Sequence, residues 1–141
     1  MTPVIQQSER FAAPARELYA ISLDPKRHAA FTGHPVTISP RPGSRFRAFR
    51  GMISGTILAA VPGKLIVQRW RSVHFKKSDP DSILVLQFFD DDSRRGWGRI
   101  ELAHIKVPRQ DHAGVRKGWP THYWKPLRLY LKQPRPSQRS R

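Results

Sequence analysis

The sequence predicts an α+β domain in which an antiparallel sheet curves around one long C-terminal helix. Near the C-terminus, large apolar residues recur at steps of three or four, the spacing of one helical face. They are Trp119, Tyr123, Leu127 and Tyr130 or Leu131. Upstream, short stretches alternate apolar and polar residues between regularly spaced turn signals, as strands do. A helix over residues 111–132 would run roughly 30 Å, and its apolar face needs a surface as broad as such a sheet.

The first part of the chain is expected to hold one strand and two short helices. Residues 4–11 are a rather polar strand, which favours a position near a sheet edge. A first helix follows over residues 15–21. Asp24 and Pro25 then open a second helix as N-cap and first helical residue, and Gly33 ends it.

A meander of six strands is expected to follow. Turn signals at Pro42-Gly43, Gly51 and Pro62-Gly63 separate the first of them, and connections this short force antiparallel neighbours. The expected strands begin near Val36, Phe46, Ser54, Leu65, Ile83 and Trp97.

Two prolines interrupt the predicted C-terminal helix. Each removes a backbone donor, and a proline inside a helix costs about 3 kcal/mol. Pro120 is easier to accommodate if the helix begins only near Val115. Pro126 is expected to kink the helix, so that it bends over a concave sheet.

Length and composition limit the class of protein. A chain of 141 residues with 38% hydrophobic residues can build the core of one globular domain, placed at residues 1–132. The basic, proline-rich residues 133–141 are expected to be disordered. There is no cysteine, which excludes disulfides, thiolate metal sites and cysteine nucleophiles. The first residues lack a signal-peptide pattern and no apolar run could span a bilayer, so we expect a cytoplasmic protein.

The charge is strongly positive. The chain has 26 basic and 10 acidic residues, a formal net charge of +16. Such a charge suits an anionic partner, namely nucleic acid, a membrane surface or an acidic protein, and it equally suits solubility alone. Strand alternation turns one set of arginines away from the helix, a candidate partner surface of Arg45, Arg47, Arg69, Arg71 and Arg99. No recognised nucleic-acid module accompanies the charge, so nucleic-acid binding ranks behind protein docking.

No motif predicts a catalytic centre, a metal site or a cofactor. The six histidines lack the i, i+4 spacing with a nearby carboxylate that marks zinc enzymes. The three aspartates at 90–92 match a hairpin tip better than a cation site. No phosphate-binding loop or catalytic triad spacing is present. His104 shares the strand parity of Ile100 and Leu102, so we expect it to point toward the helix, as a hydrogen-bonded core histidine would.

Several short motifs together carry a resemblance to a known family. They are Phe11-Ala12-Ala13-Pro14, Asp24-Pro25, Phe31-Thr32-Gly33, Pro42-Gly43, Gly51 to Gly55, Pro62 to Arg71, Ile100 to His104, Gly118-Trp119 and Tyr123-Trp124. Over residues 4–131 the chain resembles the helix-grip proteins of the START and polyketide-cyclase (SRPBCC) superfamily. Within it, the chain looks like the bacterial-type single-domain homologues of the activator of the heat-shock-protein-90 ATPase.

The resemblance implies a seven-stranded antiparallel sheet around the C-terminal helix, with two short helices between the first two strands. It also implies a hydrophobic cavity between sheet and helix and a link to the stress response. It carries over no catalytic residue and no cofactor.

These observations favour a non-enzymatic protein that binds an apolar or amphipathic small molecule in that cavity. Four tryptophans exceed what packing alone needs, so a partly open aromatic pocket is expected. The candidate ligand-binding residues are Gln68, Trp70, Phe88, Leu102, His104, Trp119, Tyr123 and Leu127. The first alternative is a co-chaperone-like factor whose arginine surface docks an acidic protein such as a chaperone. The second is a cyclase or hydrolase with His104 or Tyr123 as acid or base.

Overall fold

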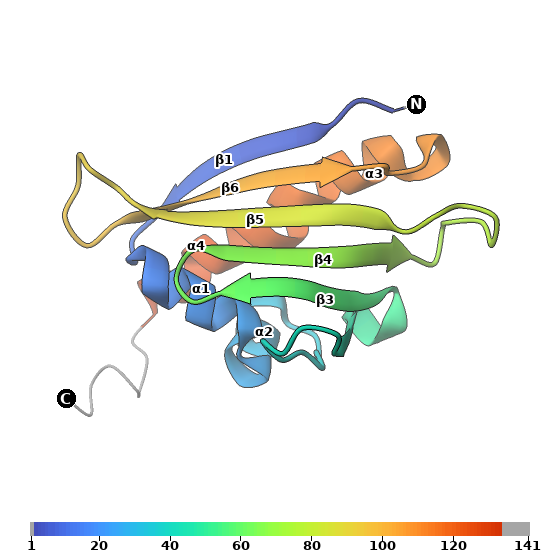
Figure 1. The fold of residues 1–141 in the computed structure, drawn as a ribbon. Helices are drawn as coiled ribbons and strands as arrows, with labels where there is room; N and C mark the ends of the chain where they lie inside the picture. The colour runs from blue at the N-terminus through green and yellow to red at the C-terminus, as the bar shows by residue number, and fades with distance from the viewer. Residues whose placement is uncertain (1, 134–141) are drawn as a thin grey trace.

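Two layers form the fold, an antiparallel sheet and a set of helices packed on one of its faces (Figure 1). The computed structural model describes residues 2–133. The strands are β1 (Ile5–Phe11), β2 (Arg45–Ala48), β3 (Ile53–Val61), β4 (Leu65–Ser72), β5 (Ser82–Asp90) and β6 (Gly98–Ile105). The helices are α1 (Ala15–Leu23), α2 (Pro25–Thr32), the 3-10 turn η1 (Phe49–Gly51), α3 (Arg109–Trp119), the π-helical turn η2 (Pro120–Trp124) and α4 (Lys125–Lys132). The predicted α+β class is confirmed. The predicted disordered tail covers residues 133–141, and all of it except Gln133 lies outside the described residues.

The strands follow the order β1-β6-β5-β4-β3-β2, and every neighbouring pair is antiparallel. The helices α1 and α2 carry the chain from β1 at one edge to β2 at the other (Figure 1). The predicted edge position of the first strand is therefore confirmed, and the last strand, β6, lies beside it.

The sheet has six strands where the resemblance implied seven. The strand expected near Val36 is reduced to one isolated bridge between Thr37 and Arg47. Pro35 and Pro40 flank this segment, and a proline has no backbone N–H to donate to a ladder. Regular pairing therefore stops on both sides of the bridge.

The C-terminal helical segment has nearly the expected extent, and it changes geometry at Pro120 rather than at Pro126. It begins at Arg109, within two residues of the expected start at Asp111, so the later start near Val115 that would have suited Pro120 is not adopted. It runs through the π-helical turn η2 to Lys132. The wide turn is marked by a hydrogen bond from the Lys125 N–H to the carbonyl oxygen of Pro120, five residues earlier.

Gln7 on β1 stabilises the helical segment on both sides of Pro120. Pro120 has no N–H to offer the carbonyl of Arg116, four residues earlier, and the Nε2 group of Gln7 donates to that oxygen instead at 3.0 Å. The Oε1 atom of Gln7 accepts from the indole N–H of Trp124 at 2.6 Å. A side chain from the edge strand thus compensates for the hydrogen bond that the proline removes.

The core lies between the two layers. Alternate strand residues point toward the helices, and most are buried, including Phe46, Ile57, Ile66, Trp70, Leu84, Phe88, Ile100 and Leu102. The helices cover them with Leu18, Ile21, Phe31, Trp119, Trp124 and Leu127. Each such side chain contributes about 1.5–3 kcal/mol through burial, so this interface fixes how the C-terminal helices lie on the sheet.

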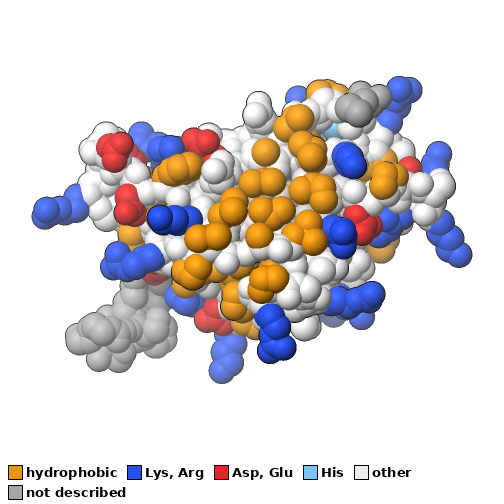
Figure 2. Space-filling view, viewed as in Figure 1, with side chains coloured by type: hydrophobic (Ala, Val, Ile, Leu, Met, Phe, Trp, Pro, Cys, Tyr) orange, Lys and Arg blue, Asp and Glu red, His pale blue; other side chains and the backbone are white. Residues whose placement is uncertain are grey.

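The outer face of the sheet, which is turned away from the helices, differs from the expected row of guanidinium groups. Its centre is an outer apolar patch on β4, β5 and β6, shown in Figure 2 with basic groups around it. The patch consists of Leu65, Val67, Ile83, Val85, Ala103 and Ile105, which alternate with the buried residues of the same strands.

The five predicted partner-surface arginines divide into two groups. Arg45, Arg47 and Arg69 are exposed. Arg71 is half-buried and pairs with Asp81 at 2.7 Å, and Arg99 pairs with Glu101 at 2.8 Å, so these two cations are already compensated. The exposed part of the predicted surface is therefore smaller than the sequence suggested.

Candidate functional site

A groove of about 560 Å³ opens between one end of the sheet and α3, within the size range of small-molecule sites. We call it the α3 groove. Its walls come from the loop before β2, from η1 and the residue after it, from β3 and β4, and from one face of α3 and η2. The lining residues are His34, Phe49, Arg50, Met52, Ile53, Trp70, Ser72, His74, Asp111, Gly114, Val115, Gly118, Trp119, His122 and Tyr123.

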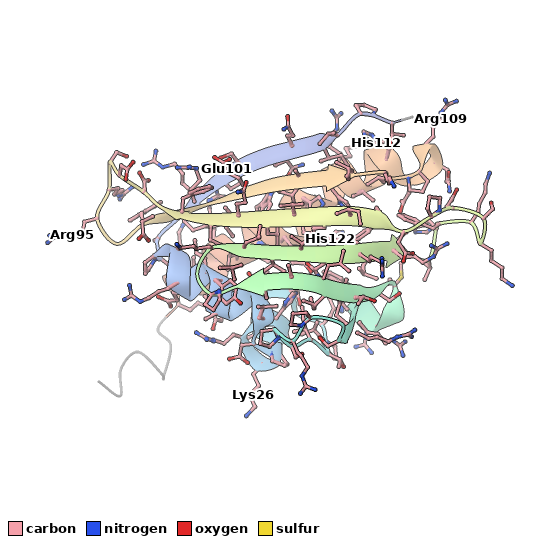
Figure 3. All side chains as sticks on the ribbon, in the orientation of Figure 1. Lys26, Arg95, Glu101, Arg109, His112 and His122 are labelled. Atoms are coloured by element: carbon pink, nitrogen blue, oxygen red, sulfur yellow. The ribbon has the colours of Figure 1, made fainter. Side chains whose placement is uncertain are left out.

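The helical wall is one face of α3 continued into η2. Its lining residues, from Asp111 to His122 (Figure 3) and Tyr123, follow one another at steps of one and three, which keeps them on one side of the helix. Gly114 and Gly118 lie one turn apart on this face. An added Cβ would meet only the Asp111 Oδ1 atom, at 3.4 Å, or the His122 Cδ2 atom, at 3.7 Å.

Neither of these glycines is required by backbone conformation or by close packing. Alanine would fit at both positions, and glycine inside a helix is less stable than alanine by about 0.5–1 kcal/mol. Their effect on the structure is to leave the helical wall of the groove without side chains at Gly114 and Gly118, and so to leave the groove open.

A buried polar pair lies in the groove wall. The Ser72 hydroxyl donates to the Oδ2 atom of Asp111 at 2.5 Å, and both side chains are buried. Asp111 also lies in the first turn of α3, where the helix dipole favours a negative charge. The protein itself therefore compensates this carboxylate.

The space at the centre of the two layers is almost filled. A second void, between the middle of the sheet and the helices, measures about 30 Å³, the room of roughly one water molecule. Of the predicted ligand-binding residues, Trp70, Trp119 and Tyr123 line both this void and the α3 groove. Gln68 and Leu127 line only the void. The room for a ligand thus lies at the end of the helix–sheet interface and not at its middle.

The other three predicted residues, Phe88, Leu102 and His104, are buried and line neither space. Phe88 packs edge-on against Tyr19, with 5.7 Å between ring centroids. Leu102 belongs to the hydrophobic core cluster.

His104 is enclosed, and both of its ring nitrogens are committed. The Ser82 hydroxyl donates to the Trp70 carbonyl at 2.6 Å, so its oxygen accepts from the Nε2–H of His104 at 2.9 Å. The Nδ1 atom accepts from the indole N–H of Trp119 at 3.3 Å. Burial, with a smaller effect from the charge of His112, lowers the pKa of His104 from 6.5 to about 3. His104 is therefore neutral and has no free nitrogen for acid–base chemistry.

The hydroxyl of Tyr123 is fixed in a similar way. The Nδ1–H of His28 donates to the Ser22 carbonyl at 2.8 Å, which leaves Nε2 to accept from the Tyr123 hydroxyl at 3.1 Å. Burial lowers the pKa of His28 and raises the pKa of Tyr123, so both groups are neutral. Tyr123 contributes a half-buried ring with an oriented hydroxyl to the groove.

The aspartates at the β5–β6 connection serve turn and capping chemistry. The Oδ1 atom of Asp90 accepts from the Ala15 N–H at the start of α1, at 2.9 Å, and Asp91 pairs with Arg10. Within residues 2–133, no three histidine, aspartate or glutamate side chains converge as metal ligands. No helix in that part of the chain is long and apolar enough to cross a membrane.

Gly114, Gly118, His122 and the turn at Gly51 were not among the predicted site residues. The glycines were detectable, because Gly114 and Gly118 precede His122 at steps of four, directly beside the parallel row of Trp119 and Tyr123. Nothing in the sequence placed η1 beside α3, since the two are brought together only by the packing of the layers.

Comparison with known proteins agrees with this architecture. A family model described as "Activator of Hsp90 ATPase homolog 1-like protein" matches residues 12–132. An uncharacterised protein of Schizosaccharomyces pombe is 43% identical over 70 residues, which cover 50% of this chain and 21% of that protein. The chain thus spans about a fifth of the length of this curated relative.

Two solved structures show the same fold. An HSP90 activator from Plasmodium falciparum superposes with a TM-score of 0.82 at 17% identity, covering 94% of this chain and 99% of that one. CalU16 from Micromonospora echinospora superposes with a TM-score of 0.75 at 23% identity, covering 97% of this chain and 79% of that one. Because the family match extends from the residues before α1 to the end of α4, the chain belongs to the Activator of Hsp90 ATPase homolog 1-like family, with its helix-grip fold.

Proposed function

We propose that the chain binds an apolar or amphipathic small molecule in the α3 groove. The observation that carries this proposal is the open volume of about 560 Å³ next to the rings of Phe49, Trp70 and Trp119. Aromatic side chains give a rigid apolar wall, and the tyrosine and histidine tips beside them can orient a polar group. The centre of the helix–sheet interface has no such room.

Simple arithmetic sets the affinity to look for. A two-ring ligand that buries about 200 Å² of apolar surface gains about 5 kcal/mol. Taken alone, this gain corresponds to a Kd of about 0.2 mM. Association entropy opposes it, so apolar contact alone supports at best millimolar affinities. Titrations should therefore reach millimolar ligand concentrations.

The test uses Gly114, one of the two glycines that leave the groove open. N-phenyl-1-naphthylamine, a neutral probe whose fluorescence rises in apolar sites, is titrated against the wild type and two variants. Gly114→Phe places a ring in the groove and is expected to weaken binding at least about tenfold, whereas Gly114→Ala, the matched control, leaves it nearly unchanged. Equal binding by the wild type and Gly114→Phe would place the probe elsewhere and reject the groove as its site.

A second candidate function is docking of an acidic protein surface, as a co-chaperone would do. Two observations favour it. The outer apolar patch has no partner among residues 2–133 that packs it into the core, and the exposed Arg69 lies beside it on β4. The basic residues labelled in Figure 3, Lys26, Arg95 and Arg109, project from the periphery and add a long-range attraction for acidic partners.

The name of the structurally similar Plasmodium protein suggests the partner to test, Hsp90. ATP hydrolysis by purified Hsp90 is measured with the wild type, with Arg69→Glu and with Val85→Asp on the outer apolar patch. Stimulation that both variants reduce, and that raised salt weakens, supports docking through the outer face. No stimulation and no binding by the wild type would remove this candidate.

A further inference from the structure

The turn η1 has a backbone conformation that needs support from elsewhere. Phe49, Arg50 and Gly51 follow one another with φ values of 52°, 58° and 87°. For a residue other than glycine this left-handed conformation costs about 1–2 kcal/mol, and here two such residues are adjacent. Such a turn persists only when its surroundings hold it.

Ring contacts across the α3 groove provide this support. The ring of Phe49 lies 5.3 Å from that of His34, 5.9 Å from that of His122 and 5.8 Å from that of Tyr123, between centroids. With Phe49 held against the helical wall, the next residue, Arg50, lines the same groove and is exposed at its rim. The strained turn thus positions a cation beside the aromatic walls.

The polar groups of the groove differ in whether the protein satisfies them. Asp111 accepts a hydrogen bond from Ser72, as described above, and the Tyr123 hydroxyl donates to His28. By contrast, the side chain of Arg50 makes no hydrogen bond or ion pair within residues 2–133.

The histidine rings are similarly uncommitted. Within the described part of the chain, the rings of His34, His74 and His122 make no hydrogen bond, and the Nδ1 atom of His34 is buried without a partner. Together with Arg50 they give the groove one fixed cation and three imidazoles that are able to donate.

We infer that the α3 groove selects an amphipathic carboxylate. The flat apolar body of the ligand lies against the rings of Trp70 and Trp119, and its carboxylate is bound by the guanidinium of Arg50 with His34 or His122 as a further donor. A guanidinium matches a carboxylate with two parallel hydrogen bonds. This inference rests on the proposed function and narrows it to one class of ligand.

A cationic ligand is the opposite reading, since aromatic walls beside a carboxylate also bind ammonium groups. The structure disfavours it for two reasons. The charge of Asp111 is already compensated by Ser72 and the helix dipole. Arg50 at the rim and the net charge of +16 both repel a cation and attract an anion.

The test compares three probes with the same ring system, 2-naphthoate, 2-naphthalenemethanol and 2-naphthylmethylammonium, by isothermal titration calorimetry. The expected result is that 2-naphthoate binds at least about tenfold more tightly than the alcohol, as one charge-assisted hydrogen bond would give. Arg50→Gln should remove this preference and leave the affinity for the alcohol unchanged. Arg50→Gly, which also relieves the strained turn, should do the same. Arg45→Gln, an exposed arginine outside the groove, is the matched control and should keep the preference.

The outcomes separate this inference from the proposed function. Equal binding of the acid and the alcohol, or tightest binding of the ammonium probe, overturns the carboxylate preference while small-molecule binding stands. A preference for 2-naphthoate that survives both Arg50 variants also overturns it. If none of the three probes binds at millimolar concentration, the groove is not a small-molecule site of this kind and both proposals fail.

Discussion

The buried His104 makes the stability of this protein depend on pH in a window where few other groups act. The folded state keeps the ring neutral down to about pH 3, because burial disfavours its charged form. Protonating Nδ1 would also set its N–H against the indole N–H of Trp119. The unfolded chain takes up that proton below the ordinary pKa of 6.5. The folded-state pKa is thus depressed. The contribution of His104 to the free energy of unfolding is therefore fully present above pH 6.5 and is lost as the pH decreases from 6.5 toward 3.

The size of the effect follows from the pKa difference. At pH 5, which is about 1.5 pH units below the ordinary histidine pKa, protonation stabilises the unfolded state by about 2 kcal/mol, whereas at pH 7.5 it contributes almost nothing. The folded state gains no such stabilisation in this range. Burial also lowers the pKa of His28, with the same sign. Hydrogen bonds lower the pKa values of Asp79, mainly from the Lys76 N–H, and of Asp91, mainly from the Ser93 hydroxyl. These carboxylates lose their contribution only below about pH 4.

The substitution His104→Gln isolates this contribution. A glutamine amide can still donate toward Ser82 and accept from Trp119, but it does not titrate. Urea unfolding followed by tryptophan fluorescence at several pH values between 7.5 and 5 is expected to show that the wild type loses about 2 kcal/mol more than the variant. His74→Gln, an exposed histidine, is the control and should behave as the wild type. Equal losses in the wild type and His104→Gln would refute the reasoning.

Three further predictions concern stability. Gln7→Leu should lower the free energy of unfolding by about 1–3 kcal/mol, because it leaves the Arg116 carbonyl and the Trp124 indole without partners, whereas the exposed Gln6→Leu should change it little; chemical denaturation measures both. Asp90→Ala should lower the free energy of unfolding by about 1 kcal/mol, because Asp90 caps the Ala15 N–H of α1, whereas Asp92→Ala should change it little. Equal melting temperatures of the two variants would contradict this role. Gly55→Ala should lower the free energy of unfolding by about 3 kcal/mol or more, since the new Cβ would lie 1.8 Å from the backbone oxygen of Arg69. Gly114→Ala is expected to fold as well as the wild type. Soluble yield and melting temperature measure the difference.

Much of the fold could be predicted because local patterns carried it. Asp24 and Pro25 begin α2 and Gly33 ends it in the left-handed conformation, as expected from capping chemistry. Five of the six strands after the helices begin within one residue of the expected positions, because strand alternation and turn residues are local signals. The strand expected near Val36 does not form, because Pro35 and Pro40 stop its pairing on both sides of the Thr37–Arg47 bridge.

The prolines of the C-terminal helix show where local reasoning ends. Pro120 was expected to fit more easily in a helix that begins near Val115, because a missing N–H is costly inside a helix. The structure keeps the helix whole by using Gln7, more than a hundred residues away, to satisfy the freed carbonyl of Arg116. No reading of the segment alone could supply that partner.

The sequence by itself determined the element types, the antiparallel sheet, the covering helix and the aromatic character of the interface, because each follows from the type and spacing of residues that are close together in the chain. The position of the groove was decided only in the tertiary structure. Side-chain volumes fill the middle of the interface and leave it open where Gly114 and Gly118 face the η1 turn, and such packing depends on residues that are far apart in the chain.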